Sequence, residues 1–202
     1  MSVDRDEVIE ELLARGAERQ RVPWSRRRRI VVWSGTIIAL AGAVAILMIQ
    51  RDRQRKDLRV LIREAAERHN LDPTFVEAVV IAESNGNARA ISRAGAVGLM
   101  QLMIPTATEM AGRAQSDPVT REALFDPVYN LDLGCKYLAH LGARFDWDPR
   151  RILIAYNAGQ TRLRRWERTG ATTDEILKKH APSETRAYVR RVLEFRKALL
   201  EP

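Results

Sequence analysis

The longest uninterrupted apolar stretch of the chain covers residues 30–49, which contain no charged side chain. At about 1.5 Å rise per residue, a helix of this length crosses a hydrocarbon core of about 30 Å. Four consecutive arginines at 26–29 precede the stretch, and Arg51, Arg53, Arg55 and Lys56 follow it. Basic residues favour the headgroup regions on either side of a bilayer, so the pattern predicts one transmembrane helix.

A cleaved secretory signal is the alternative interpretation of this stretch. Its apolar core would be shorter, and it would end at a small-x-small cleavage site, which residues 46–49 do not offer. The flanking basic residues are nearly equal in number at the two ends, so charge alone does not set the orientation. Because long C-terminal domains translocate largely regardless of charge, we expect a single pass through the cytoplasmic membrane. The N-terminus would lie inside and the larger domain in the periplasm or extracytoplasmic space.

The pattern therefore divides the chain into four parts. They are an N-terminal cytoplasmic tail (1–29), a transmembrane helix (30–49), a charged connector (50–56) and an outer domain (57–202).

Past the apolar stretch, helical periodicity recurs between turn signals, and no sustained alternation of apolar and polar residues interrupts it. The outer domain is therefore predicted to be mainly α. Asp72 and Pro73 supply the N-cap and first position of a helix that ends near Ser84. Other helices are expected over residues 58–69, 98–103, 128–145, 149–157, 173–180 and 184–200.

The helix that starts at Pro73 carries Glu83 near its C-terminal end. Its apolar residues Val76, Val79 and Val80 would bury the helix against its neighbours. We expect Glu83 to lie between this apolar wall and a cleft, since the following segment, 85–98, is rich in Gly, Ala, Asn and Ser. On periodicity alone, however, a solvated glutamate at a helix end is the better interpretation.

The excess of positive charge does not indicate a nucleic-acid partner. Of 34 Lys and Arg and 26 Asp and Glu, residues 1–56 hold 12 and 7, which leaves 22 and 19 for residues 57–202. Most of the surplus therefore flanks the predicted span, and the outer domain has no interleaved basic and aromatic stripe. We expect no nucleic acid among the partners.

Cysteine and histidine, the residue types typical of metal and redox sites, are few in this chain. Cys135 is the single cysteine, which excludes an internal disulfide, and its leucine neighbours at helical spacing predict a buried core residue. His69, His140 and His180 have no metal-ligand spacing among themselves. Phosphate-binding glycine loops are absent from the sequence. We predict no metal and no cofactor.

Several short motifs follow one another in the outer domain. They are Glu83-Ser84, Ala90-Ile91-Ser92, the run from Gly98 to Met103, Asn130 with Gly134 and Tyr137, the run from Ala155 to Gly159, and Glu184-Thr185 with Tyr188-Val189. In order and spacing this set resembles the family of soluble-lytic-transglycosylase-type (SLT) domains, over roughly residues 58–200. The resemblance implies a lysozyme-like helical fold for the outer domain.

The resemblance also implies an activity. The enzyme would be a membrane-anchored lytic transglycosylase that cleaves the bond between N-acetylmuramic acid and N-acetylglucosamine in peptidoglycan glycan strands. Glu83 would protonate the glycosidic oxygen and then, as a carboxylate, remove the proton from the C6 hydroxyl of the same sugar, giving a 1,6-anhydro product. Partners would be the glycan strands and, through residues 30–49, the lipid bilayer.

Ordinary glycosidases use two carboxylates, and no second acid lies near Glu83 in the sequence. The next acid is Glu109, and sequence distance leaves Asp126 and Asp132 open as spatial neighbours.

By the same resemblance, a set of residues would bind substrate. Ser92 and Gln101 would hydrogen-bond the sugar and its N-acetyl group, while Tyr156 would lie beside Glu83 and Asn157 would support the groove. Met103 and Glu184 are assigned to the groove and to the peptide-stem region. Each also has an ordinary structural interpretation. Ser92 can be a helix cap, Gln101 a surface amide and Asn157 a helix-ending residue. Tyr156 and Met103 can be core residues, and Glu184 can be a charge at a helix N-terminus.

The sequence departs from the family's usual pattern after Glu83-Ser84. A bulky residue is usual where Gly86 stands, Asn-Pro becomes Asn87-Ala88, and Pro105 comes one position late. These changes bear on the shape of the groove rather than on the acid.

Two other classes of function remain open at this stage. A goose-type lysozyme-like muramidase would release a reducing sugar instead of an anhydro sugar. A non-catalytic peptidoglycan-binding accessory of a wall-spanning machine would not turn over at all, but the presence of Glu83, Gln101 and Tyr156 together argues against it.

Overall fold

The computed structural model describes residues 41, 43, 44, 48, 50, 56–112 and 118–201. The chain divides into two units, residues 1–52 and 53–202. Across the described residues, no helix is long and apolar enough to cross a membrane. The predicted tail lies outside these residues, as does nearly all of the predicted span and of the connector, so these three parts stay predictions.

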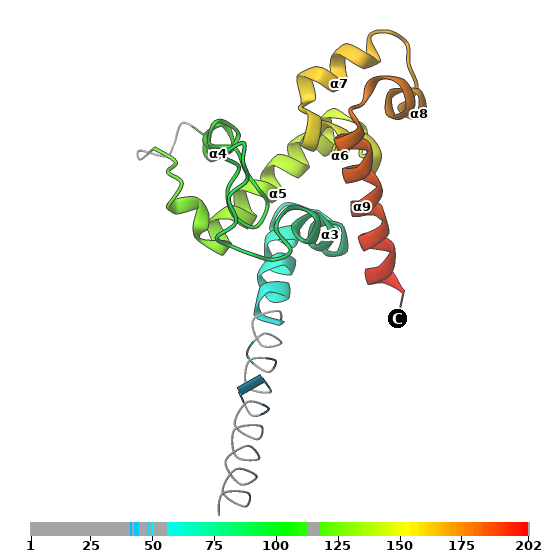
Figure 1. Cartoon of the computed structure of the whole chain (residues 1–202). Coiled ribbons are helices and arrows are strands. Elements are labelled where there is room, and N and C mark those ends of the chain that lie inside the picture. Colours follow the sequence, from blue (N-terminus) through cyan, green and yellow to red (C-terminus); the bar gives the residue numbers. More distant parts are fainter. Residues whose placement is uncertain are drawn as a thin grey trace, which may run out of the picture. The chain divides into compact units, whose positions relative to one another are not determined.

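The second unit is mainly helical, as the sequence predicts (Figure 1). A helix covers residues 56–68. The elements that follow are α3 (Pro73–Ser84), α4 (Ile104–Ala111), the 3₁₀ turn η1 (Ala123–Phe125), α5 (Pro127–Arg144), α6 (Pro149–Ala158), α7 (Gln160–Glu167), α8 (Thr173–Glu175), the π turn η2 (Ile176–His180) and α9 (Ser183–Leu200).

Three of these helices begin at the same dipeptide, Asp-Pro. The aspartate accepts a hydrogen bond from a backbone N–H in the first turn, and the proline occupies the position that needs no donor. The capping distances are 2.9 Å from Thr74 N to Asp72, 2.8 Å from Tyr129 N to Asp126 and 2.8 Å from Arg150 N to Asp148. This local chemistry explains why the start of α3 was predicted correctly.

The core forms around α5, whose side chains Leu131, Leu138 and Leu141 are completely buried. α4 and α6 both pack against α5, while α3 packs mainly against α9 (Figure 1). Cys135 lies in this core, where burial raises the pKa of its thiol to about 12, so it is a packing residue, as expected.

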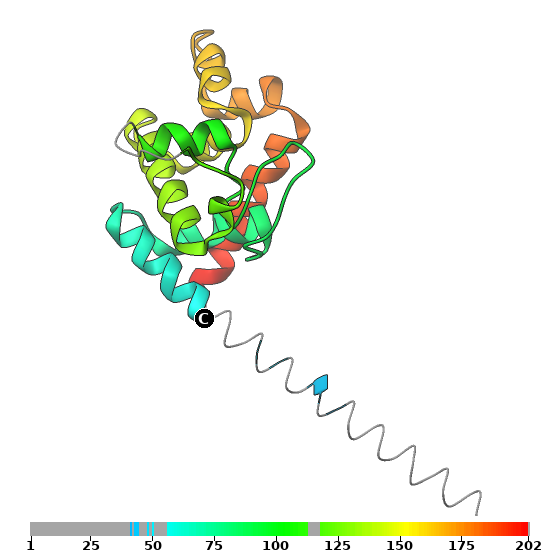
Figure 2. The same cartoon turned by 90° about the vertical axis from the view of Figure 1, so that its left-hand side faces the viewer.

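The segment between α3 and α4 differs from the prediction. The helix expected over residues 98–103 is wrong, because Ile91, Val97 and Leu102 form isolated β-bridges and the chain turns back on itself (Figure 2). Gln101 and Gly98 have φ of 46° and 80°, in the left-handed region, which a right-handed helix does not use. The next helix, α4, starts only at Ile104. Neither α4 nor α7 is among the helices predicted from the sequence.

Candidate active site

Glu83 lies in the last turn of α3, as the sequence predicts. The residue as a whole is partly exposed, while its carboxyl is largely withdrawn from water. Burial raises the pKa of its carboxyl from 4.5 to about 7, because removing water disfavours the charged form. Tyr188 and Arg191, both on α9, act in the opposite direction and lower the pKa by a smaller amount. A carboxyl with this pKa can hold a proton and also release it near neutrality, which general acid and base catalysis requires.

Two tyrosines border this carboxyl. Tyr188 is 2% exposed, and its hydroxyl has no hydrogen-bond partner of standard geometry among the described residues, although the hydroxyl interacts with Glu83. Tyr156, on α6, donates to the carbonyl oxygen of Met100 at 2.7 Å. Burial first, and then the nearby Glu83 carboxylate, raise the pKa of Tyr156, so both tyrosines remain neutral donors.

The loop that leads away from Glu83 is held by buried hydrogen bonds to its backbone. Ser84 donates to the carbonyl oxygen of Leu99 at 2.8 Å, next to the bond from Tyr156 to Met100. Asn130, which is completely buried in α5, accepts from Met100 N at 2.9 Å and donates to the carbonyl oxygens of Val97 at 3.0 Å and of Leu124 at 2.9 Å. Three helices thus fix the position of residues 97–100 relative to Glu83.

A glycine is required where this loop passes Asn130. Gly98 has φ of 80°, and a Cβ atom there would overlap the Asn130 amide and the Leu124 carbonyl oxygen. The loop can therefore approach α5 closely only with glycine at this position.

Ser92 and Gln101, predicted to bind the sugar, both lie on this loop. The Ser92 hydroxyl accepts from Ala96 N at 3.0 Å within a tight turn. The Gln101 amide donates to the carbonyl oxygens of Gly98 at 2.9 Å and Ala90 at 3.2 Å. These bonds orient the Gln101 side chain. Its side-chain oxygen has no partner among the described residues, so it can accept a hydrogen bond from a ligand.

The other predicted residues come from three different elements. Met103, the N-cap of α4, is 42% exposed, so it is not a core methionine. Asn157, near the end of α6, accepts a 2.8 Å hydrogen bond from Thr185 and so ties α6 to α9. Glu184 is exposed in the first turn of α9, next to this bond. Their roles toward substrate stay predictions.

The acids considered as second carboxylates are engaged elsewhere. Asp126 caps α5, and Asp132 pairs with Arg68 at 3.3 Å and His69 at 3.0 Å. No described acid contributes to the pKa of Glu83, whereas a second carboxylate close by would raise it. The described part of the site therefore contains one acid rather than a pair.

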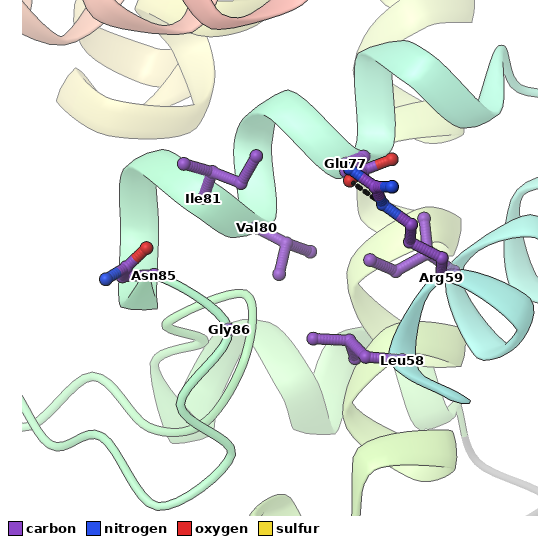
Figure 3. A pocket seen from close by; sticks show the side chains of 8 residues that line it. Leu58, Arg59, Glu77, Val80, Ile81, Asn85 and Gly86 are labelled. Carbon is purple, nitrogen blue, oxygen red and sulfur yellow. Dashed lines mark hydrogen bonds and ion pairs between the residues drawn. The ribbon is translucent and has the colours of Figure 1, made fainter. Parts of the chain in front are cut away.

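Next to the turn that carries Glu83, a cavity of ≈ 270 Å³ lies between α3 and the helix over residues 56–68 (Figure 3). Leu58 faces Val80 across it, and Arg59 pairs with Glu77 at 2.7 Å on one side. Gly86 lines it with φ of 77°, and a Cβ atom there would come within 3.0 Å of the Leu58 side chain. A bulky residue in place of Gly86 would therefore change this cavity behind α3.

Within residues 56–112 and 118–201, no three His, Cys, Asp or Glu side chains come together as metal ligands would. The absence of a metal and of a cofactor stays a prediction.

Sequence reasoning named two residues that matter here only as parts of motifs and assigned a role to neither. Tyr188 belonged to a recognised motif, but only packing of α9 on α3 brings it to Glu83. Asn130 is buried only because α5 packs against the neighbouring elements. A polar residue between apolar ones in the buried helix α5 was the available signal.

We expect kcat/KM to fall above about pH 7, because only the protonated Glu83 can act as an acid. Tyr188→Phe and Arg191→Gln each remove an interaction that lowers the Glu83 pKa, so each should move this limb to higher pH. Arg190→Gln changes the adjacent arginine, which pairs with Glu194 instead, and should leave the limb in place. Rate profiles that coincide for all four proteins would contradict the assignment of the limb to Glu83.

The fold and the site define a lysozyme-like helical domain with one buried acid at the end of a helix. The model of the Transglycosylase SLT domain family matches residues 60–178, and the chain belongs to this family.

Relatives and solved structures agree with this assignment. The chain is 31% identical over 135 residues to the membrane-bound lytic murein transglycosylase C of Edwardsiella ictaluri (strain 93-146), covering 62% of this chain and 38% of the relative. An inactive variant of the lytic transglycosylase Slt from Pseudomonas aeruginosa superposes with a TM-score of 0.63 at 29% identity, over 71% of this chain and 24% of that one. The 70-kDa soluble lytic transglycosylase from Escherichia coli gives 0.62 at 29% identity, over 67% and 23%. The chain thus spans less than half of each.

Proposed function

We propose that this protein is a peptidoglycan lytic transglycosylase that cleaves the β-1,4 bond after N-acetylmuramic acid and forms a 1,6-anhydro sugar. The observation that carries the proposal is Glu83, a buried carboxyl with a pKa of about 7 and no second described acid acting on it. The inactive Slt variant carries glutamine in place of one glutamate, which supports an essential role for a glutamate in that protein.

In the first half of the proposed reaction, the protonated Glu83 donates its proton to the glycosidic oxygen as the bond to C1 breaks. The leaving N-acetylglucosamine departs as an alcohol, and positive charge develops at C1. Since a neutral acid is needed, the buried environment that keeps Glu83 protonated near neutrality favours this step.

In the second half, the Glu83 carboxylate accepts the proton of the C6 hydroxyl, and that oxygen bonds to C1. The acid is regenerated and no water is consumed. The attack is intramolecular, which gives a large proximity advantage. The neutral hydroxyl of Tyr188 would stabilise the carboxylate during its brief existence, because it lies close enough to hydrogen-bond with it.

The origin of the oxygen at the new sugar end tests the proposal. After digestion of peptidoglycan in water labelled with oxygen-18, we expect unlabelled anhydro-muropeptides, about 20 mass units lighter than the labelled products that hydrolysis would give. Mass spectrometry distinguishes the two. Quantitative label at the new sugar end would contradict the proposal and indicate a lysozyme-like muramidase. Asp126 and Asp132 would then be the acids to mutate first.

We further propose that residues 30–49 anchor the enzyme in the cytoplasmic membrane, with the catalytic domain outside. Support comes from the uncharged length of this stretch and its basic flanks, and the Edwardsiella ictaluri relative is itself named membrane-bound.

The protein should then remain in the membrane fraction after carbonate washing, whereas a variant lacking residues 30–49 should be released. Protease added to spheroplasts should digest the C-terminal domain and spare the tail. Protection of the domain instead would contradict the topology and with it the access to peptidoglycan.

A further inference from the structure

A further cavity, of ≈ 510 Å³, lies against α9 on the side away from the candidate active site. Its apolar lining consists of Leu177 of η2 and of Val189 and Leu193 of α9. Lys197, which also lines it, is nine residues after Tyr188, the α9 residue that interacts with Glu83. Nine residues make about two and a half turns of helix, so the cavity and Glu83 lie on opposite sides of α9.

Basic side chains surround this apolar lining. One acid, Glu194, lines the cavity together with five cations, which are Arg150, Lys178, Arg186, Arg190 and Lys197. Arg150 is held closely by Asp174, at 2.6 Å. Lys178 and Arg186 have no acidic partner among the described residues, and Arg190 and Lys197 form only exposed ion pairs, of 3.9 Å and 3.6 Å. Exposed pairs of this kind contribute little, so four cations are available to an anionic partner.

The apolar residues continue beyond the cavity toward the end of α9. Leu200 is 63% exposed and follows Leu193 by seven residues, about two turns, so the two leucines lie on one face of the helix. We call this face, with Arg186, Arg190 and Lys197 beside the leucines, the outer face of α9. A helix face that combines exposed apolar and basic residues is typical of helices that lie on an anionic membrane surface.

The position of α9 within the domain agrees with such a partner. The C-terminal end of α9 lies at the same end of the domain as the start of the helix over residues 56–68 (Figures 1 and 2). Residues 50–56 connect that helix to the proposed span, and seven residues cover at most about 25 Å even when fully extended. Under the proposed anchoring, this end of the domain therefore stays close to the bilayer.

We propose that the outer face of α9 docks on an anionic membrane surface. Leu193 and Leu200 would lie among the headgroups and upper acyl chains, and Lys178 and Lys197 would pair with lipid phosphates. An acidic helix of another protein would match the same charges, but only the membrane also accounts for the place of this face at the anchored end of the domain. The proposal rests on the proposed anchoring and does not depend on the reaction.

Lipid contact in the reconstituted full-length chain tests the proposal. The chain is placed in lipid nanodiscs of phosphatidylcholine alone, or of equal parts of phosphatidylcholine and phosphatidylglycerol. A fluorescent dye on Leu200→Cys reports contact with lipids that carry a spin-label quencher on the acyl chain. Cys135 does not compete for the dye, because it is buried and the pKa of its thiol is raised to about 12. We expect quenching in the phosphatidylglycerol discs and its loss in phosphatidylcholine discs or at high salt.

Two pairs of substitutions make the test specific to this face. Lys178→Gln with Lys197→Gln should lower the ratio of docked to undocked domains by about 25-fold, from about fivefold for each basic residue near such a surface. Arg162→Gln with Arg165→Gln removes the same charge from exposed residues of α7 that do not line the cavity, and should leave the quenching unchanged. Thermal unfolding confirms that each variant is folded.

Absence of quenching in the phosphatidylglycerol discs would overturn the proposal and leave an acidic protein helix as the partner of this face. Equal losses from the two pairs of substitutions would overturn it as well. A chain that stays in the discs at high salt but is never quenched would retain the anchor and lose this surface. A chain that is quenched at low salt but leaves the discs at high salt would retain the surface and lose the anchor.

Discussion

Replacing Glu83 by glutamine is expected to lower kcat by about 10²–10⁴-fold without loss of the fold, the range typical of removing a general acid. Glutamine is nearly isosteric with glutamic acid, but it cannot donate the proton that the leaving sugar needs. The measurement is the initial rate of muropeptide release by purified full-length protein. Glu77→Gln is the matched control, because Glu77 lies on the same helix and pairs with Arg59 instead. A rate close to that of the wild type would remove Glu83 from the mechanism.

The same substitution should change stability in a way that depends on pH. The carboxyl has a pKa of 4.5 when unfolded and about 7 when folded, so the unfolded chain releases its proton first as pH rises. Wild-type stability is therefore lost progressively between these values, by about 3 kcal/mol in total. Glutamine does not titrate. Relative to wild type, Glu83→Gln should gain stability from pH 4 to pH 8, as urea unfolding at several pH values would reveal. A pH-independent difference would contradict the buried, neutral acid.

Asn130→Ala should destabilise the protein by about 3–5 kcal/mol, the second large effect. It removes three buried hydrogen bonds and leaves Met100 N and the carbonyl oxygens of Val97 and Leu124 without them. The loop beside Glu83 should loosen as well, so activity should fall at temperatures where the protein is still folded.

Asn87→Ala is the control for this prediction. Asn87 is exposed and its side chain accepts one hydrogen bond, from Arg89 N at 3.0 Å, so we expect a loss below about 1 kcal/mol. Thermal unfolding and initial rates of both variants check the comparison. Similar losses in the two variants would mean that burial of Asn130 adds nothing to its contribution.

Local chemistry along the chain was enough to predict much of the helical framework. The Asp-Pro start at Asp72 places α3, and apolar periodicity places α5, α6 and α9 to within a few residues, because caps and amphipathic faces depend on neighbours in sequence. The position of Glu83 at the end of α3 follows from the same signals. The motifs and their order were also sufficient to recognise the family that the comparison later confirmed.

Periodicity failed between α3 and α4 for a physical reason. Residues 98–103 contain enough apolar side chains for a helix, but the chain there is held by bonds to Ser84, Asn130 and Tyr156, which are distant in sequence. These bonds favour the turns and bridges over local helix formation.

The chemistry of the site was likewise decided by tertiary structure. A glutamate at a helix end is ordinary, and the sequence by itself determined only its identity and its place in α3. Its pKa of about 7 arises because tertiary packing removes water from the carboxyl, and Tyr188 and Arg191, which packing of α9 also brings to it, offset only part of that rise. The cavity beside Val80 and Gly86 is of the same kind, because it exists only where the helix over residues 56–68 meets α3. Local propensities act between neighbours in sequence, whereas desolvation and the pairing of charges depend on which distant surfaces come together.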